Sequence, residues 1–322
     1  MASLFEARAR RVGGQAAGAP ADVIPRDPGT GSERKPAVGS QALFIHPAPL
    51  GPTLFYSEFG QAACEPHVVR ALDLDPKPRR WPPSGGRLGF VIRPDAGDQA
   101  GLQARISAAH PPVGDAPSVL SIAGSDLRLG WLRRKLYGIH VLIDSDPLDL
   151  FAAVGATDWI DERLALAQRN LASRLFDYPA SLAGLREPGA PGRFHGIGRR
   201  RAARAAAPEA AAYAILFHAW LLRFLHGLSF ADLVVDQERI ANEPHCAALD
   251  ERIAASTGLR LAIPAAGPDR AVDGPADHAG IEREVLDCLP MSALEAFIDR
   301  ARIGRRIGEI SPRKAAMLDR IL

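Results

Sequence analysis

The sequence predicts an α/β fold, in which a short and mainly parallel β-sheet is covered by helices on both faces. Four short apolar runs have the length and residue types of buried strands, and stretches with helical periodicity separate them. These runs are residues 42–45, 118–122, 139–143 and 233–236. Parallel strands need long crossover connections, which are commonly helices, so this alternation favours a parallel sheet. We expect residues 41–322 to form one domain, preceded by a loosely packed arm at 1–40 that is rich in Gly, Pro and charge.

The first predicted unit, residues 41–66, is a strand followed by a turn and a helix. The turn after the strand holds three prolines and Gly51, and a helix-like stretch begins at Thr53. Backbone N–H groups and the positive end of the helix dipole make such a unit suitable for binding an anionic phosphate. An ordinary β–α connection has the same pattern, so this stretch alone leaves both interpretations open.

Strands and helices alternate through the rest of the chain. Residues 68–74 are predicted to form a short helix, and residues 88–92 a short strand or the start of a helix. The β-branched run 139–143 is the best predicted strand, because it is bounded by glycine and aspartate. Residues 179–201 and 264–279 are predicted to be connections. Further helices are predicted at 96–110, 127–136, 146–154, 160–174, 209–228, 244–256, 281–289, 291–303 and 312–322.

We expect a cytoplasmic protein that binds neither a membrane nor nucleic acid, and the charge balance by itself argues neither for nor against nucleic acid. The 322 residues are 47% hydrophobic and carry a formal net charge of +2, which is enough apolar material for a core and a mild charge balance. No apolar stretch reaches the roughly 18–20 residues that a membrane span needs. The most apolar one, 210–228, is interrupted by His218, Arg223 and His226. Three cysteines without metal-ligand or redox spacing fit a reducing compartment, and we expect no metal.

Three stretches, taken in order, resemble the motifs of the bacterial sulfotransferase family. FIHPAPLGPTLF, with Glu65-Pro66 after the next helix, resembles the family's first strand, donor loop and E-P pair. GSDLRLGWLRRKLYGIHVLIDSDPLDLFAAV resembles its basic helix and the strand that ends in R-D-P-x-D-x-F-x-S. LVVDQERIANEPHCAALDERIAASTGL resembles its later strand and helix. The resemblance implies a three-layer α/β/α fold of the sulfotransferase or P-loop-like kind, with a helical C-terminal portion. It also implies sulfuryl transfer from the donor 3′-phosphoadenosine 5′-phosphosulfate.

The loop that the resemblance assigns to the donor phosphosulfate departs from the family pattern. Gly51 and Thr53 match that pattern, whereas Pro49 and Pro52 replace a basic residue and a hydroxyl residue. Proline also lacks a backbone N–H donor, so the predicted cradle has lost a cation and at least one N–H. The residues of this predicted donor loop are Pro49, Leu50, Gly51, Pro52, Thr53 and Leu54.

The second motif departs from the family at the predicted nucleotide end. Ser145 stands where resembling proteins have the arginine that binds the donor 3′-phosphate, and Ala153 replaces the serine that accompanies it. Arginine binds phosphate bidentately, and serine cannot replace that charge. Arg128, Arg133, Arg134 and Lys135, on one predicted helix, would either supply the missing positive field or form an ordinary solvated face.

Two residues are candidates for catalysis. The resemblance makes Glu65 the general base that takes the proton of the acceptor hydroxyl, and the alternative is that Glu65 braces the turn before Pro66. His46 follows the first predicted strand, where α/β proteins gather ligands at the carboxyl ends of the sheet. It is therefore a candidate for contact with a substrate or an anion.

The sequence leaves three functions open, of which the third is that the same pocket binds a different anionic donor through changed contacts. The first is transfer of a sulfuryl group to a hydroxyl or amine of a small-molecule, glycan or peptide acceptor. The second is a catalytically inactive sulfotransferase-fold protein that has lost the donor site and binds a ligand or a protein partner. The retained Glu65, Gly51 and Thr53 favour the first function, and the departures at the donor positions favour the second.

Overall fold

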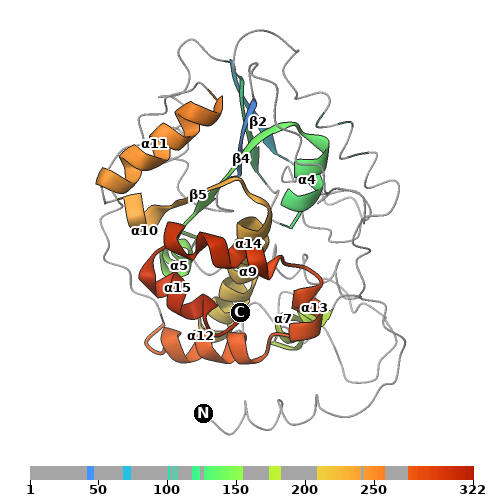
Figure 1. Cartoon of the computed structure of the whole chain (residues 1–322). Coiled ribbons are helices and arrows are strands. Elements are labelled where there is room, and N and C mark those ends of the chain that lie inside the picture. The colour runs from blue at the N-terminus through green and yellow to red at the C-terminus, as the bar shows by residue number, and fades with distance from the viewer. Residues whose placement is uncertain are drawn as a thin grey trace, which may run out of the picture. The chain divides into compact units, whose positions relative to one another are not determined.

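The computed structural model describes part of the chain, and the described residues all belong to one compact unit, Arg34–Leu322. Figure 1 shows the described elements in colour. The described residues are 42–46, 68–73, 118–123, 127–154, 174–182, 209–240, 243–257 and 275–322, together with positions 101, 104 and 106.

Five described strands form a parallel sheet in the order β2-β3-β1-β4-β5. The α/β class is therefore confirmed, and so are the four strands that the sequence predicts. The chain leaves the central strand β1 towards β2 on one side, and it leaves β4 towards β5 on the other side. Ligands of open α/β sheets bind at such a topological switch point, outside the carboxyl ends of the strands. The strands are β1 (Ala42–His46), β2 (Val68–Asp73), β3 (Ser118–Ala123), β4 (Gly138–Asp144) and β5 (Leu233–Asp236).

The two faces of the sheet pack against different helices, because side chains alternate along each strand. On one face, Leu43, Val141 and their neighbours pack against α11 (Glu243–Thr257). On the other face, Phe44 and Leu120 pack against α4 (Leu129–Lys135), and Leu142 belongs to the core around α9. Described helices therefore cover both faces of the sheet (Figure 1).

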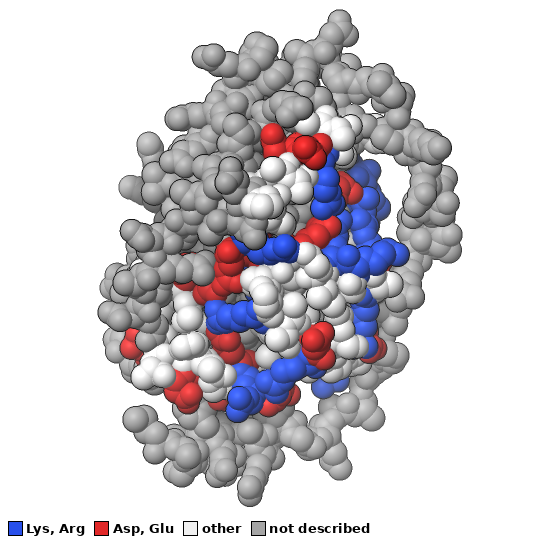
Figure 2. Space-filling model, turned by 60° about the vertical axis from the view of Figure 1, so that its left-hand side comes forward, with Lys and Arg blue, Asp and Glu red and all other residues white. Residues whose placement is uncertain are grey.

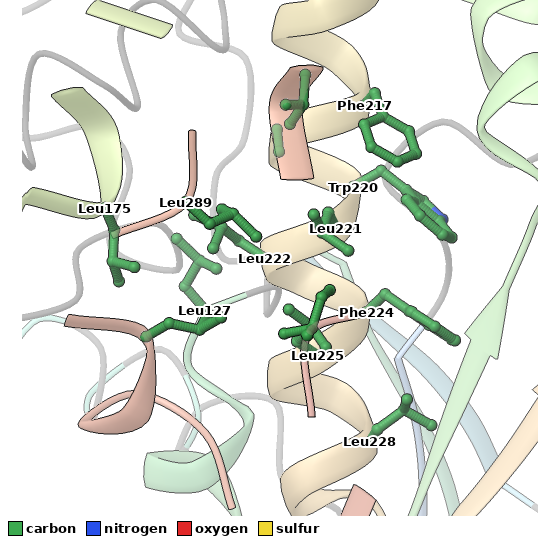
Figure 3. Close-up of a cluster of buried hydrophobic side chains, with 14 of the residues drawn as sticks. Leu127, Leu175, Phe217, Trp220, Leu221, Leu222, Phe224, Leu225, Leu228 and Leu289 are labelled. Carbon is green, nitrogen blue, oxygen red and sulfur yellow. The ribbon is translucent and has the colours of Figure 1, made fainter. Parts of the chain in front are cut away.

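Helix α9 (Glu209–Phe230) is the centre of the largest core. All of its residues from Ala211 to Ser229 are buried, as expected for a helix that is apolar on every side. Figure 3 shows its leucine and aromatic side chains among those of other elements. It is the one described helix that is long and apolar enough to span a membrane. Of its most apolar stretch of 18 residues, 94% is buried inside the protein. Arg223 is nevertheless one of these buried residues.

The C-terminal helices pack on α9 and bring the end of the chain to the sheet. Their buried side chains in the shared core include Val285, Leu294, Ile303 and Leu318. Asp299 caps α14 and Ser311 caps α15, and each cap accepts a hydrogen bond from the backbone of its helix. These elements are α12 (His278–Asp287), α13 (Met291–Glu295), α14 (Arg300–Arg306), the 3₁₀ helix η3 (Ile307–Glu309) and α15 (Pro312–Leu318).

Short helices flank the strands elsewhere in the described chain. As predicted, α5 begins directly behind Asp146, which accepts a hydrogen bond from Leu148 N at 2.7 Å. Gly101, Ala104 and Ile106 are helical, in agreement with the helix predicted there. These short helices are α5 (Pro147–Val154), the 3₁₀ helix η2 (Arg174–Phe176), α7 (Asp177–Leu182) and α10 (Gln237–Ile240).

The helix predicted at residues 68–74 is wrong, because residues 68–73 form strand β2. All six residues pair in parallel with β3, from Val68 opposite Ser118 to Asp73 opposite Ala123. Pairing with a neighbouring strand thus decides the conformation of a segment whose Ala and Leu content favours a helix.

Three predicted boundaries are also wrong. The helix predicted at 291–303 is divided into α13 and α14, because Phe297 and Ile298 turn into the core and Asp299 caps a new helix. The connection predicted at 179–201 begins inside α7, and the one at 264–279 ends where α12 starts at His278. The predicted element at 88–92, residues 160–173 of the helix predicted at 160–174, and the arm at 1–40 lie outside the described residues, whereas Arg174 begins η2.

Candidate functional site

The carboxyl ends of three neighbouring strands meet at one edge of the sheet. β1 ends at His46, β4 at Asp144 and β5 at Asp236. The exposed fraction is 2% for His46 and 0% for both aspartates. His46 and Asp144 therefore lie at the switch point between β1 and β4, and Asp236 lies at the end of the neighbouring strand β5.

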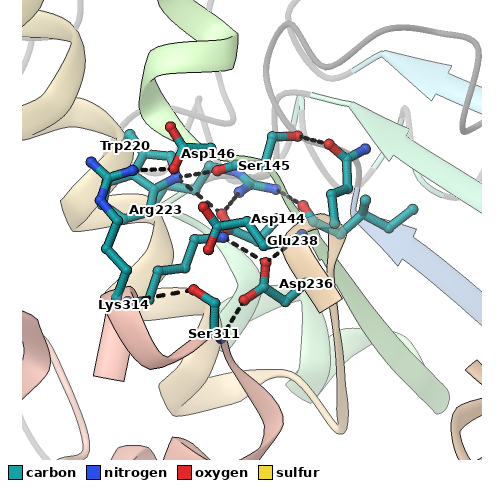
Figure 4. A network of polar contacts seen from close by, with 12 residues as sticks. Asp144, Ser145, Asp146, Trp220, Arg223, Asp236, Glu238, Ser311 and Lys314 are labelled. Atoms are coloured by element: carbon teal, nitrogen blue, oxygen red, sulfur yellow. Dashed lines mark hydrogen bonds and ion pairs between the residues drawn. The ribbon is translucent and has the colours of Figure 1, made fainter. Parts of the chain in front are cut away.

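Asp144 is surrounded by hydrogen-bond donors from α9 and α15 (Figure 4). Its Oδ1 accepts from Arg223 Nη1 at 3.2 Å and from Trp220 Nε1 at 3.1 Å, and its Oδ2 accepts from Lys314 Nζ at 2.7 Å. Burial raises the pKa of Asp144 above its ordinary value. Lys314 and Arg223 act in the other direction, but their effect is smaller than that of burial. The ion pairs and hydrogen bonds thus offset part of the cost of burying this carboxylate.

Lys314 joins two strands of the sheet through a single ammonium group. Its Nζ donates to Asp144 and, also at 2.7 Å, to Asp236 Oδ1. Burial lowers its pKa, but the attraction of the two carboxylates outweighs burial, and the net pKa lies above its ordinary value. Asp236 Oδ2 accepts from Ser311 N at 2.7 Å, so the start of α15 is fixed to the end of β5.

Arg223 connects α9 to the ends of β1 and β4. In addition to its ion pair with Asp144, its Nη2 donates to the carbonyls of Ile143 at 2.8 Å and His46 at 3.3 Å. The Arg223 side chain is 2% exposed. Arg223 thus holds the carboxyl end of β1, the last described residue before the positions at which the sequence predicts the donor loop.

A second, less buried layer of charge lies over this network. Arg313 of α15 pairs with Asp146 and, at 2.6 Å, with Glu282, which also accepts from Tyr213 Oη. The pKa of Glu238 is raised, first by burial and next by a hydrogen bond to Asp146. The Glu238 carboxyl therefore keeps its proton to a higher pH than an exposed glutamate does.

His46 and His140 form a buried hydrogen bond on the face of the sheet that packs against α4 and α9. His46 Nε2 lies 2.9 Å from His140 Nδ1, and His140 Nε2 lies 3.1 Å from the carbonyl of Leu136. Burial lowers the pKa of both rings, and His140 and Arg223 lower that of His46 further. Both imidazoles are therefore neutral near pH 7.

The structure places some of the predicted site residues and leaves others undescribed. His46 lies at the edge described above. Ser145 lies there too, buried, with its Oγ donating to Gln237 Oε1 at 2.6 Å. Ala153 lies in α5, and its side chain is outside the described part. The other predicted site residues also lie outside the described part, namely Pro49, Leu50, Gly51, Pro52, Thr53, Leu54 and Glu65.

The basic helix predicted before the best strand lies at the other end of the sheet. Helix α4 ends at Lys135, shortly before the amino end of β4 at Gly138. Arg133 pairs with Asp232 at 2.8 Å, and Arg134 and Lys135 are exposed. The structure favours a solvated face for Arg133, Arg134 and Lys135, whereas Arg128, directly before the helix, is buried. Figure 2 likewise shows basic side chains interleaved with acidic ones over much of the described surface in that view.

The polar residues of the site that the sequence does not identify as site residues include Asp144, Trp220, Arg223, Asp236 and Lys314. Arg223 had a signal, because it is the one Arg or Lys in the apolar stretch 210–228. Lys314 had none, since its segment Ser311-Pro312-Arg313-Lys314 resembles any capped surface helix. The described residues contain no group of three or more His, Cys, Asp or Glu side chains that could hold a metal ion.

Comparison with known proteins does not assign this site. The chain matches no protein-family model, no curated protein and no solved structure.

Proposed function

We propose that this chain is a cytoplasmic, sulfotransferase-like α/β protein that binds a ligand or a protein partner at the carboxyl edge of its sheet, without using the phosphoadenosine donor. The proposed architecture is the three-layer α/β/α arrangement of sulfotransferases and P-loop proteins. The order of the strands supports this proposal, because the three stretches that resemble the family contain β1, β4 and β5. These strands are neighbours in the sheet, with their carboxyl ends together.

The charge of the described edge is the main support for a function without the donor. Among eight charged residues at this edge, three cations face five carboxylates, which leaves these eight with a formal surplus of two negative charges. The phosphoadenosine donor is itself a polyanion, and a surplus of negative charge in a partly desolvated crevice opposes its binding. The residues counted are Arg223, Arg313 and Lys314, and Asp144, Asp146, Asp236, Glu238 and Glu282.

The bonding of the described cations gives a second line of support. Each of the three already pairs with at least one carboxylate, and Arg223 also donates to two carbonyls. Ser145 likewise donates to Gln237. A donor phosphate would have to compete with these internal partners, and a buried pair that loses one member is strongly destabilised.

Sulfuryl transfer is the second candidate function. The switch-point position of His46 and the resemblance of the flanking motifs favour it, because a transferase of this kind needs its donor loop after β1. In that case Glu65 or His46 would take the acceptor proton, and the phosphosulfate would lie against residues 49–54.

Calorimetric titration with 3′-phosphoadenosine 5′-phosphate at low salt separates the two functions. We expect no measurable heat from the unmodified protein. Micromolar binding that Gly51→Pro weakens would contradict the proposal and favour the transferase. In the matched variant Glu238→Gln/Glu282→Gln, the formal surplus of two negative charges is removed. Binding by this variant alone would show that the charge of the edge is what excludes the nucleotide.

A further inference from the structure

We propose that a surface formed by the end of α4 and by α14 binds an acidic segment of a protein partner. It lies beside the amino ends of β4 and β5, whereas the candidate site lies at their carboxyl ends. The inference therefore does not depend on the proposed function. The residues of this surface, which we call the arginine surface, are Arg133, Arg134, Lys135, Tyr137, Arg302 and Arg305.

Arginines of the two helices meet at the turn between α9 and β5. Arg133 of α4 pairs with the Asp232 carboxylate at 2.8 Å. Arg306 of α14 donates from Nη2 to the carbonyl of Ala231 at 2.6 Å and to that of Asp232 at 2.9 Å. Arg302 Nη2 lies 3.4 Å from the same Ala231 carbonyl. Because Ala231 and Asp232 are consecutive, guanidinium groups from both helices lie close together around them.

The carboxylates described at this turn already have donors on both oxygens. Asp232 uses its second oxygen to accept from the backbone N–H of His140 at 3.0 Å. Glu309, which pairs with Arg306 at 2.9 Å, accepts from Arg252 with its other oxygen at 3.2 Å. These carboxylates therefore offer little to a further cation.

Arg302 is such a further cation. It is partly buried and forms no ion pair with another described residue. Burial lowers its pKa most, and the nearby Arg133 and Arg306 lower it next, against the attraction of Asp232 and Asp299. An anion that binds at this cluster would relieve the repulsion between these like charges.

The rest of the arginine surface is open to a partner. Arg134, Lys135 and Arg305 are exposed, and neither of these two arginines forms an ion pair within the described part of the chain. Tyr137 is 63% exposed, the most of any large hydrophobic side chain among the described residues. Arginine and tyrosine are enriched in protein–protein interfaces and among their energetically dominant residues. This composition favours a protein partner over a membrane or a nucleic acid.

The chemistry of the surface specifies an acidic partner. A guanidinium group binds a carboxylate through two parallel hydrogen bonds. Each such pair contributes less than about 1 kcal/mol at an exposed position, so a small anion binds weakly. A peptide segment with several carboxylates engages the arginines together. Its binding should weaken with added salt, because exposed charges are screened.

Fluorescence anisotropy with a dye-labelled octaglutamate peptide tests the surface on the full chain, and octaglutamine with the same dye is the control for charge. We expect octaglutamate to bind at low salt and octaglutamine not to bind. Arg134→Glu/Arg305→Glu should weaken binding about tenfold or more, because two favourable contacts become repulsive. Arg283→Glu/Arg320→Glu changes the net charge equally at exposed positions elsewhere, and it should weaken binding by less than about threefold.

No binding of octaglutamate by the unmodified protein, or equal weakening by the two variants, would overturn the inference. Arg134→Gln/Arg305→Gln should weaken binding by a smaller factor, because it removes the charges without reversing them. All of the substituted arginines are exposed, so the variants should keep the circular dichroism of the unmodified protein.

The class of partner is tested with octathymidylate and with vesicles that contain phosphatidylserine. Tighter binding of either than of octaglutamate, lost in Arg134→Glu/Arg305→Glu, would overturn the assignment of a protein partner. Each of these outcomes leaves the proposed function untouched, because the variants keep every residue of the carboxyl edge.

Discussion

Replacing Lys314 by methionine tests the buried ion network most directly. The lysine side chain is 2% exposed, and its Nζ lies 2.7 Å from a carboxylate oxygen of Asp144 and 2.7 Å from one of Asp236. Methionine keeps most of the length of the side chain and removes its charge. Asp144 would then keep its ion pair with Arg223, and Asp236 would lose the ion pair that Lys314 gives it. Removing one partner of a buried ion pair costs about 3–5 kcal/mol, and we expect a loss of that size in the free energy of unfolding near pH 7.

The pH dependence of this variant has a definite sign. In the unmodified protein, burial raises the pKa of Asp144 and Lys314 partly offsets that rise. Without the Lys314 ammonium, the pKa of Asp144 in the folded protein therefore rises further above its value in the unfolded chain. The folded variant then holds a proton that the unfolded chain releases, and its stability falls as pH rises through the raised pKa. The deficit relative to the unmodified protein should therefore be smaller near pH 5 than near pH 7.

Urea denaturation followed by circular dichroism at the two pH values measures both effects. Arg320→Met is the matched control, because it removes a cation from the exposed pair with Asp287. That change should alter the free energy of unfolding by less than about 1 kcal/mol. If Lys314→Met behaves like the control, or is more destabilised at the lower pH, the ion network described above does not exist in solution.

Three further predictions concern the helices that support the site. Gly227→Ala should lower the free energy of unfolding by roughly 1–3 kcal/mol in urea denaturation, because the added Cβ would lie 2.4 Å from Leu142 Cδ2. Gly304→Ala, with nothing within 4 Å of its Cβ, should instead raise it by about 0.5–1 kcal/mol. Asp299→Ala should cost about 1 kcal/mol through loss of the α14 cap, and Asp299→Asn should restore most of it. Burial lowers the pKa of His218 to about 4, so stability should fall as pH drops from 6.5 towards 4, and His218→Leu should remove that part of the slope.

Local patterns predicted most of the described elements. The runs at 42–45, 118–122, 139–143 and 233–236 are strands, because short apolar β-branched segments between turns have few other stable environments. The buried helix α9 was predicted for the same kind of reason. Strand β2 was missed, because its conformation depends on a ladder with β3 about fifty residues away, and no local pattern contains that partner.

The candidate site was predicted less completely than the fold. The position of His46 at the end of β1 follows from its sequence alone, since it directly follows an apolar run. Its hydrogen bond to His140 does not, because the two residues are 94 positions apart and meet only when β1 and β4 are neighbours in the sheet. Ser145 was identified through the resemblance, and its bond to Gln237 depends on the pairing of β4 with β5.

The sequence by itself determined the α/β class, the parallel sheet and the edge at which polar residues gather, because periodicity and strand ends are local properties of the chain. The tertiary structure alone decided which charges meet at that edge. Arg223 reaches Asp144 only because α9 crosses β4, and Lys314 reaches two strands only because the C-terminal helices pack back on α9. Ion pairs between residues 79 and 170 positions apart depend on how layers pack, which no spacing in the sequence specifies.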